Sequence, residues 1–287
     1  MQDHPSQPLP DVTIDALTGL LAKPHAVRLV DLRPLAAFEE AHLPGASHLD
    51  LSEIDRPYLR PPRRRSLILL AGTAEEAREG ARRLALAGYT ARALDAPVSL
   101  WPGPLESGPE KIPAWEPSPL VGRWAGDLPP GRALDLACGS GRDAVFLAMR
   151  GAEVTAIDIL PDALEQAAML ARRHGVAVDL RQGDIEQDPA CWEGRWGAIH
   201  VHRFLHRPGL PLLTERLRDG GLLLYETFLE QQARIGLKPR NPAHLLKTGE
   251  LLEAAAGLNV IEYREGVTED GDWTASLAAR KEAGNEG

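Results

Sequence analysis

Two glycines and two aspartates stand where strand-like segments end in the second half of the sequence. In Leu134-Asp-Leu-Ala-Cys-Gly-Ser-Gly-Arg-Asp143, an apolar strand pattern gives way to Gly139 and Gly141 and then to a helical pattern. Glycines permit a tight turn there and let a ligand approach the main chain closely. Asp135 lies inside this strand pattern, and Asp158 closes the next one. We therefore expect a ligand site at the carboxyl ends of these strands.

The charge of the ligand decides between two kinds of cofactor. The pattern of Gly139, Gly141 and Ala144 alone also fits NAD or FAD. Asp135 argues against a dinucleotide, because its phosphates are negative, whereas S-adenosylmethionine carries a positive ammonium and sulfonium that a carboxylate favours. Asp158 is placed to accept the ribose hydroxyls that both cofactors share. The pattern predicts S-adenosylmethionine, with a nucleotide as the alternative.

Polar side chains at the ends of the next two strand patterns are candidates for the acceptor side. His200 and His202 share one face of a strand, and His206 falls in the following loop. Tyr225 and Glu226 end the strand after that. We predict catalytic roles for His206, Tyr225 and Glu226, with His206 and Glu226 as candidates for the base that a hydroxyl acceptor needs. No metal is expected, because no nearby carboxylate completes a ligand set with the three histidines.

Strands and helices alternate throughout this half, which predicts a doubly wound α/β domain. The last two strands are joined by a turn at 268–272, which predicts an antiparallel hairpin at the sheet edge. The expected strands are 133–137, 153–158, 177–181, 198–202, 221–226, 259–264 and 273–279. The expected helices are 143–149, 161–174, 187–192, 208–217 and 247–256.

Residues from about Trp124 to Ala279 resemble the class I S-adenosylmethionine-dependent methyltransferases, in particular the tellurite-resistance and thiopurine methyltransferase-like group. The residues that match are Asp135-Leu-Ala-Cys-Gly-Ser-Gly141, Asp158, Gly183-Asp184 and Gly220-Gly-Leu-Leu-Leu-Tyr-Glu226. Ala137 replaces the first glycine of the family's usual loop. The resemblance implies methyl transfer to a small-molecule acceptor.

The same resemblance implies roles for individual residues around the cofactor. The loop residues hold the methionine moiety, and Asp158 holds the ribose. Asp184 reaches the adenine amino group, and Ile185 lies against the ring. The cofactor-binding residues that we predict are Asp135, Ala137, Gly139, Gly141, Asp158, Ile159, Asp184 and Ile185.

The first half of the sequence predicts a second, smaller domain. Strand patterns at 27–32, 67–70 and 90–94 alternate with helical patterns at 12–21, 34–40 and 74–87, which predicts a small parallel sheet. Seven prolines between Pro97 and Pro119 exclude a helix or central strand there and predict a wrapping linker. The expected domains are 1–109, a linker at 110–123, and 124–287.

Val30-Asp-Leu-Arg33, Phe38 and His42-Leu-Pro-Gly-Ala-Ser-His48 make this half resemble a rhodanese-like domain, over about Leu9 to Pro109. Rhodaneses transfer sulfur through a cysteine persulfide after the strand that corresponds to 67–70. That position falls on Ala71, and the domain contains no cysteine. Glu75 and Glu76 would repel an anion at the following helix start. We expect a catalytically inactive module used for packing, dimerisation or presentation of the acceptor.

Composition limits the partners. The formal charge of −9 opposes nucleic acid, and no apolar run is long enough to span a membrane. The polar start 1–10 lacks the features of a secretory signal, so we expect a cytoplasmic protein. The basic segment 60–65 predicts a solvated turn, with a contact patch as the alternative. Besides a methyltransferase, we consider an S-adenosylmethionine-binding regulator without turnover and a sulfurtransferase; the missing cysteine argues against the last.

Overall fold

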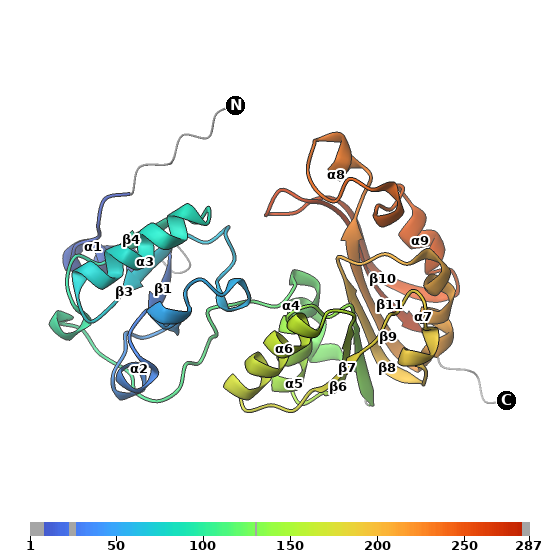
Figure 1. The fold of residues 1–287 in the computed structure, drawn as a ribbon, viewed down its shortest axis with the longest axis horizontal. Coiled ribbons are helices and arrows are strands. Elements are labelled where there is room, and N and C mark those ends of the chain that lie inside the picture. The colour runs from blue at the N-terminus through green and yellow to red at the C-terminus, as the bar shows by residue number, and fades with distance from the viewer. Residues whose placement is uncertain (1–8, 23–26, 130, 283–287) are drawn as a thin grey trace. The chain divides into compact units, whose positions relative to one another are not determined.

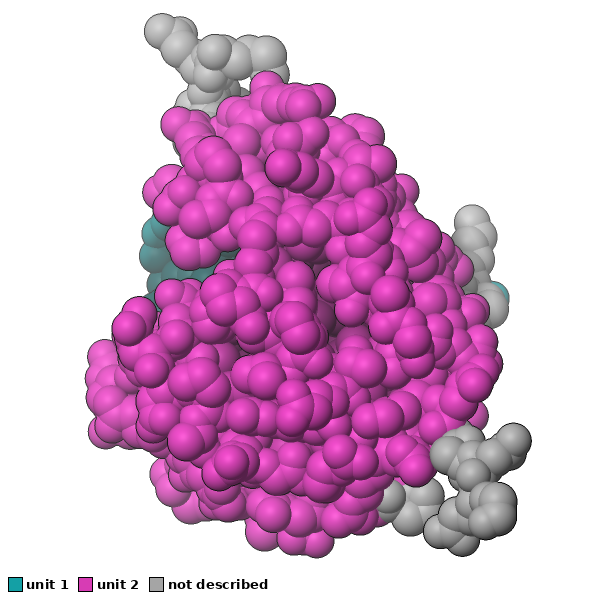
Figure 2. Space-filling model, turned by 90° about the vertical axis from the view of Figure 1, so that its right-hand side faces the viewer, with its two compact units in different colours: residues 1–116 teal, residues 117–287 magenta. Residues whose placement is uncertain are grey.

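The chain forms two compact units in a computed structural model that describes residues 9–22, 27–129 and 131–282. Residues 1–116 make up unit 1 and residues 117–287 make up unit 2 (Figures 1 and 2). Most of the polar start 1–10 lies outside the described residues. No described helix is long and apolar enough to cross a bilayer.

Unit 1 is built on a four-stranded parallel sheet with the order β2-β1-β3-β4. The predicted parallel sheet is confirmed, and β2 is a two-residue strand that is too short to show an alternating pattern in the sequence. Apolar side chains of β1, β3, α1 and α2 form the core of the unit. The elements are α1 (Ile14–Leu21), β1 (Arg28–Asp31), α2 (Leu35–Glu40), β2 (Ser47–His48), β3 (Leu67–Leu70), α3 (Ala74–Leu86) and β4 (Ala91–Ala93).

The end of the proline-rich segment is tied to unit 1 by ion pairs. The Arg28 guanidinium donates to Glu116 Oε1 at 2.6 Å and to the Pro113 carbonyl at 2.6 Å. Arg64 donates to the other oxygen of Glu116 at 2.5 Å. Arg64 of the basic segment 60–65 therefore forms an ion pair within unit 1.

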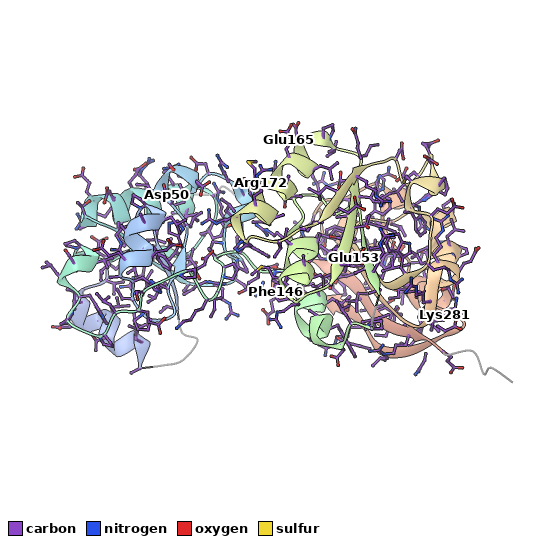
Figure 3. The ribbon with its side chains drawn as sticks, turned by 90° about the horizontal axis from the view of Figure 1, so that it is seen from below. Asp50, Phe146, Glu153, Glu165, Arg172 and Lys281 are labelled. Carbon is purple, nitrogen blue, oxygen red and sulfur yellow. The ribbon has the colours of Figure 1, made fainter. Side chains whose placement is uncertain are left out.

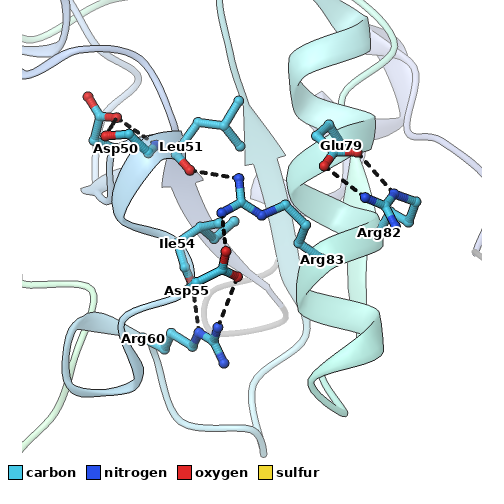
Figure 4. A network of polar contacts seen from close by, with 9 residues as sticks. Asp50, Leu51, Ile54, Asp55, Arg60, Glu79, Arg82 and Arg83 are labelled. Carbon is cyan, nitrogen blue, oxygen red and sulfur yellow. Dashed lines mark hydrogen bonds and ion pairs between the residues drawn. The ribbon is translucent and has the colours of Figure 1, made fainter.

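Arg60, at the start of the same basic segment, is also used internally. It donates to the Ile54 carbonyl at 2.6 Å and pairs with Asp55, which Arg83 of α3 also contacts (Figure 4). Arg83 reaches the Leu51 carbonyl as well, at 3.0 Å. The hydrogen bond from Arg83 lowers the pKa of Asp55. These contacts hold the irregular segment 51–60 against α3.

The loop after β3 provides the hydrogen bonds that cap the start of α3. Thr73 Oγ1 accepts from the Glu76 N–H at 3.2 Å, and Glu76 Oε2 accepts from the Thr73 N–H at 3.0 Å, which is a capping box. A Cβ at Gly72 would lie 3.2 Å from Glu76 Oε2. Ala71, at the position of the rhodanese cysteine, is 1% exposed. The carboxylate of Glu76 thus takes up donors that could otherwise bind an anion.

Unit 2 contains a seven-stranded sheet with the order β10-β11-β9-β8-β5-β6-β7. β5, β6, β7, β8 and β9 pair in parallel, and β11 runs antiparallel to both β9 and β10. The predicted doubly wound fold with a terminal hairpin is confirmed. The strands are β5 (Arg132–Leu136), β6 (Glu153–Asp158), β7 (Asp179–Gln182), β8 (Trp196–His202), β9 (Leu217–Phe228), β10 (Leu258–Val267) and β11 (Trp273–Lys281).

Helices cover both faces of this sheet (Figure 1). Apolar residues of α4 and α5 pack on one face, and those of α7 and α9 pack on the other. Exposed side chains such as Glu165 of α6 project away from the sheet (Figure 3). The helices are α4 (Pro119–Trp124), α5 (Arg142–Met149), α6 (Pro161–Arg173), α7 (Leu210–Arg216), α8 (Gln231–Arg234) and α9 (Glu250–Ala254).

A predicted linker and a predicted helix differ in detail from the structure. Residues 119–123 of the predicted linker belong to α4, because proline is tolerated in the first turn of a helix and Pro119 stands there. The predicted helix 187–192 is a short 3-10 turn, Pro189–Trp192. Neither difference changes the strand order.

Replacing Glu76 by alanine tests the capping box of α3. We expect the free energy of opening of α3 to fall by about 1 kcal/mol, since two bonds at the helix start are lost. Hydrogen exchange of the α3 amides in the full chain measures this. Glu75→Ala is the matched control, because Glu75 carries the same charge in the same turn but takes no part in the capping box of Thr73 and Glu76. Equal effects of the two changes would contradict the capping role.

Candidate functional site

The carboxyl ends of β5, β6, β8 and β9 meet at one edge of the unit 2 sheet. Asp135 of β5 is paired with Ala156 of β6 on one side and with His200 of β8 on the other. His202, the last residue of β8, is paired with Glu226 of β9. The strand register therefore brings together groups that lie far apart in the sequence.

The glycine turn follows β5 and has two different glycines. Gly139 has φ +53°, and a Cβ built on it would meet nothing within 4 Å. Gly141 has φ +73°, and a Cβ there would lie 2.5 Å from the Ala167 Cβ of α6. Gly139 thus leaves open space into which a ligand can approach, whereas Gly141 is required by the packing of α6 against the turn.

Ala137 begins this turn in the left-handed region, with φ +56°. A residue with a Cβ is disfavoured in that conformation by roughly 1–2 kcal/mol. The family's usual loop has glycine at this position. Ala137 therefore follows the backbone conformation of that loop but is strained in it.

Asp158 ends β6 beside the turn. Its Oδ2 accepts from the Gly139 N–H at 2.7 Å, and its Oδ1 accepts from the Leu160 N–H at 2.9 Å. The residue is 7% exposed. Each carboxylate oxygen can accept more than one hydrogen bond. Two backbone N–H groups thus hold the Asp158 carboxylate in place, and its oxygens can still accept further hydrogen bonds.

A buried histidine lies between two carboxylates below the turn. His200 Nδ1 is 2.9 Å from Asp135 Oδ1, and its Nε2 is 3.7 Å from Asp143 Oδ2. Asp143, in the first turn of α5, also accepts from the Ser118 N–H at 2.6 Å. Asp135 Oδ2 is buried and has no hydrogen-bond partner among the described residues. A buried acceptor without a donor is consistent with a ligand cation or N–H group at this place.

Burial and charge act against each other in this group. Burial raises the pKa of Asp135, although the neighbouring His200 acts to lower it. For His200, burial acts to lower the pKa, but the carboxylates of Asp143 and Asp135 outweigh it and raise the pKa. Sequence reasoning did not assign roles to His200 and Asp143. The signal that could have found them is a polar residue on the same face of two strands that become neighbours.

Glu226 lies on the same face of the sheet as His200 and His202. It is 7% exposed, and its Oε1 is 3.8 Å from His202 Nδ1. Burial raises the pKa of Glu226. Burial also lowers the pKa of His202 to about 4. The pair therefore combines a carboxyl group whose ionisation is opposed by burial with an imidazole that is neutral near pH 7.

Tyr225 and His206 lie on the opposite face. Both line a small cavity of about 20 Å³ together with apolar side chains, among them Leu136, Ile185 and Trp192. The Tyr225 hydroxyl donates to the Phe204 carbonyl at 2.9 Å, and burial raises the pKa of Tyr225. Successive residues of a strand point to opposite faces. The structure thus brings Glu226 to His202 and does not bring it to Tyr225 and His206.

The predicted adenine residues follow β7. Asp184 Oδ1 accepts from the N–H groups of Glu186 and Gln187 at 3.0 and 3.1 Å, which closes a turn. Ile185 is 7% exposed and belongs to the apolar lining described above. Ile159, after β6, is 51% exposed. These side chains lie on loops at the same edge of the sheet as the glycine turn.

The strand order and the glycine turn are those of a Rossmann-like methyltransferase fold, and two family comparisons agree with this class. Residues 133–219 match the family model described as a methyltransferase domain, and residues 13–101 match that of a rhodanese-like domain. The chain therefore carries a rhodanese-like domain followed by a methyltransferase domain.

The chain is similar to curated ubiquinone biosynthesis O-methyltransferases over part of its length. It is 32% identical to that of Xanthomonas campestris pv. campestris (strain B100) over 115 residues, which is 38% of this chain and 48% of the relative. It is 31% identical to that of Xanthomonas oryzae pv. oryzae (strain PXO99A) over 116 residues, 39% of this chain and 48% of the relative. The chain thus spans about half the length of the curated relatives it matches.

Part of the chain is also similar to solved structures. TehB from Haemophilus influenzae aligns with a TM-score of 0.48 and 22% identity, over 56% of this chain and 61% of TehB. Magnesium protoporphyrin IX methyltransferase (ChlM) from Synechocystis PCC 6803 aligns with a TM-score of 0.46 and 18% identity, over 56% of this chain and 80% of ChlM.

Alanine substitutions separate the two glycines. Gly141→Ala should lower the free energy of unfolding of unit 2 by about 2–4 kcal/mol, because left-handed strain and the overlap with Ala167 add together. Gly139→Ala should lower it by about 1–2 kcal/mol, since only the strain applies. Urea unfolding followed by hydrogen exchange in unit 2 measures both. A larger effect at Gly139 would show that the turn packs differently.

Replacing Glu226 by glutamine tests its burial. Because the folded state raises the pKa of Glu226, the folded protein binds more protons than the unfolded chain as the pH rises above about 4.3. The contribution of Glu226 to stability is therefore lost as the pH rises through its folded pKa. We expect Glu226→Gln to be more stable than the wild type at pH 8, with a smaller difference at pH 4.5. Urea unfolding at both values measures this, and a destabilised variant at pH 8 would refute it.

Proposed function

We propose that the chain is an S-adenosylmethionine-dependent methyltransferase that acts on a small-molecule acceptor. The observation that carries this proposal is the glycine turn, which follows the strand of Asp135, is open at Gly139 and is bonded there to the carboxylate of Asp158. The residues present fit the cofactor in shape, because nothing fills the space beside Gly139. They also fit it in charge, because Asp135 Oδ2 is a buried acceptor without a donor.

The charge argument rests on a group of residues. Asp135, Asp143 and Glu226 supply carboxyl groups on one face of the sheet, and His200 can offset one negative charge. A pyrophosphate would be repelled there, whereas an ammonium or sulfonium is attracted. This supports S-adenosylmethionine over the dinucleotide alternative.

Each predicted cofactor residue has a task in this proposal. The turn from Ala137 to Gly141 holds the methionine part, and Asp158 accepts from the ribose. Asp184 and Ile185 hold the adenine, with Ile159 at the rim. When bound, S-adenosylmethionine supplies an activated methyl group on a cationic sulfur. The protein then has to align the acceptor and exclude water, and orientation of this sort can lower a barrier by about 7–11 kcal/mol.

For unit 1 we infer a role without sulfur transfer. Ala71 stands at the cysteine position, and the capping box of α3 uses Glu76 where an anion would have to bind. Packing, dimerisation and presentation of the acceptor remain its proposed uses. Nucleic acid is not among the proposed partners, because the net charge of −9 opposes binding to a phosphate backbone. The proposed location of the protein is the cytoplasm.

Calorimetric titration of Asp158→Ala with S-adenosylhomocysteine tests the ribose assignment. We expect binding to weaken by about 1–3 kcal/mol, because charge-assisted hydrogen bonds to the carboxylate are lost. Glu153→Gln is the charge-matched control; Glu153 begins the same strand at the far end and its side chain is 79% exposed (Figure 3). Unchanged affinity of a folded Asp158→Ala would overturn the placement of the ribose. Methyl release onto thiols, amines and phenols then separates an enzyme from a cofactor-binding regulator.

A further inference from the structure

His202 and Glu226 stand beside the first residue of the glycine turn. The last paired residues of β5 and β8 are Leu136 and Val201, so Ala137 and His202 are the next residues along two neighbouring parallel strands. Glu226 is the partner of His202 on β9. The imidazole therefore lies where the turn for the methionine part of the cofactor begins.

The His202 ring is held at one edge and accessible elsewhere. Nδ1 is buried, faces Glu226 Oε1 at 3.8 Å and has no hydrogen-bond partner among the described residues. The side chain as a whole is 24% exposed. Because Nδ1 is buried, the accessible part of the ring lies away from Glu226. A distance of 3.8 Å is long for a hydrogen bond, but such contacts often tighten when substrate binds.

Several charged groups surround this ring. Glu226 faces it from β9, Asp143 from α5 and Asp272 from the turn between β10 and β11, while Arg203 follows it in the chain. The ring of His200 is stacked beside it, with centroids 6.2 Å apart. Burial keeps His202 neutral at physiological pH, so one ring nitrogen has a lone pair. Asp143 and Asp272 act in the opposite direction to burial on the pKa of His202, so they favour a proton taken up there.

We propose that His202 is the general base that takes a proton from a hydroxyl-bearing acceptor, with Glu226 as the positioning residue that holds its ring. This inference rests on the proposed methyltransferase function. The acceptor oxygen forms a bond to the methyl carbon as its proton passes to His202 Nε2. The carbon–sulfur bond of the donor breaks, and its electron pair stays on the sulfur, which becomes a neutral thioether.

The pair indicates the class of acceptor. A thiol is partly ionised near neutral pH, and an amine carries its own lone pair, so both need little help from a base. A phenol, with a pKa near 10, has to lose its proton during transfer. A neutral imidazole backed by a carboxylate serves that need. His206, one of the two candidate bases that the sequence predicted beside Glu226, lies on the opposite face of the sheet.

Methyl transfer by the full chain to catechol and to thiophenol tests the role of His202. His202→Gln should lower kcat with catechol by about 10²–10⁴-fold, the usual contribution of a general base. Its kcat with thiophenol should fall by less than about tenfold, because that acceptor is ionised at pH 8. His244→Gln is the matched control, since His244 is exposed in a short 3-10 turn. Equal losses with both acceptors would show a structural role and overturn the proposal.

Two further measurements need no turnover. Titration with S-adenosylhomocysteine should give His202→Gln and wild type the same affinity within about threefold, since the base does not hold the cofactor. Nitrogen-15 NMR of the ring, assigned by its loss in His202→Gln, should show the tautomer with the proton on Nδ1 at pH 7.5, and Glu226→Gln should alter that signal. An imidazolium, or a proton on Nε2, overturns the proposal even if neither acceptor reacts. If wild type binds no S-adenosylhomocysteine, the proposed function itself fails.

Discussion

The pairing of Asp135 with His200 is the constraint on which unit 2 depends. Both side chains are almost fully buried in the two central strands, where an unpaired charge would cost several kcal/mol. Their 2.9 Å contact links β5 to β8, and Asp143 extends the contact to α5 and, through the Ser118 N–H, to the start of α4. The backbone that leads into the glycine turn is therefore fixed from three sides before any ligand binds.

The sheet assigns different surroundings to its two faces. On the face of α4 and α5, the strand ends carry Asp135, His200, His202 and Glu226 beside a cluster of alanine, valine and leucine side chains. On the other face they carry large apolar side chains and Tyr225. Because strand residues alternate, a shift of one position moves a side chain from a polar to an apolar environment. In the proposed function, the acceptor side accordingly lies on one face, and the adenine contacts lie on the other.

The sequence predicted the strands of unit 2 and several of its helices well, since these elements show their own periodicity, whereas the short helices α4 and α8 were not predicted. Partners across strands were harder to predict. Asp135 and His200 are 65 positions apart, and only the order of the strands makes them neighbours. For the same reason His202 was not recognised as the partner of Glu226. The glycines show a similar limit: the sequence cannot tell that Gly139 faces open space while Gly141 faces Ala167.

Several local rules of protein structure are broken in one small region. Ala137 adopts a left-handed backbone, Glu226 is a buried carboxyl group, and Asp135 and His202 each bury a polar atom without a partner in the described chain. Each of these features opposes folding on its own. Folded proteins tend to keep such departures where function requires them. Their concentration at the ends of β5, β8 and β9 is an argument for the site that is independent of any relative.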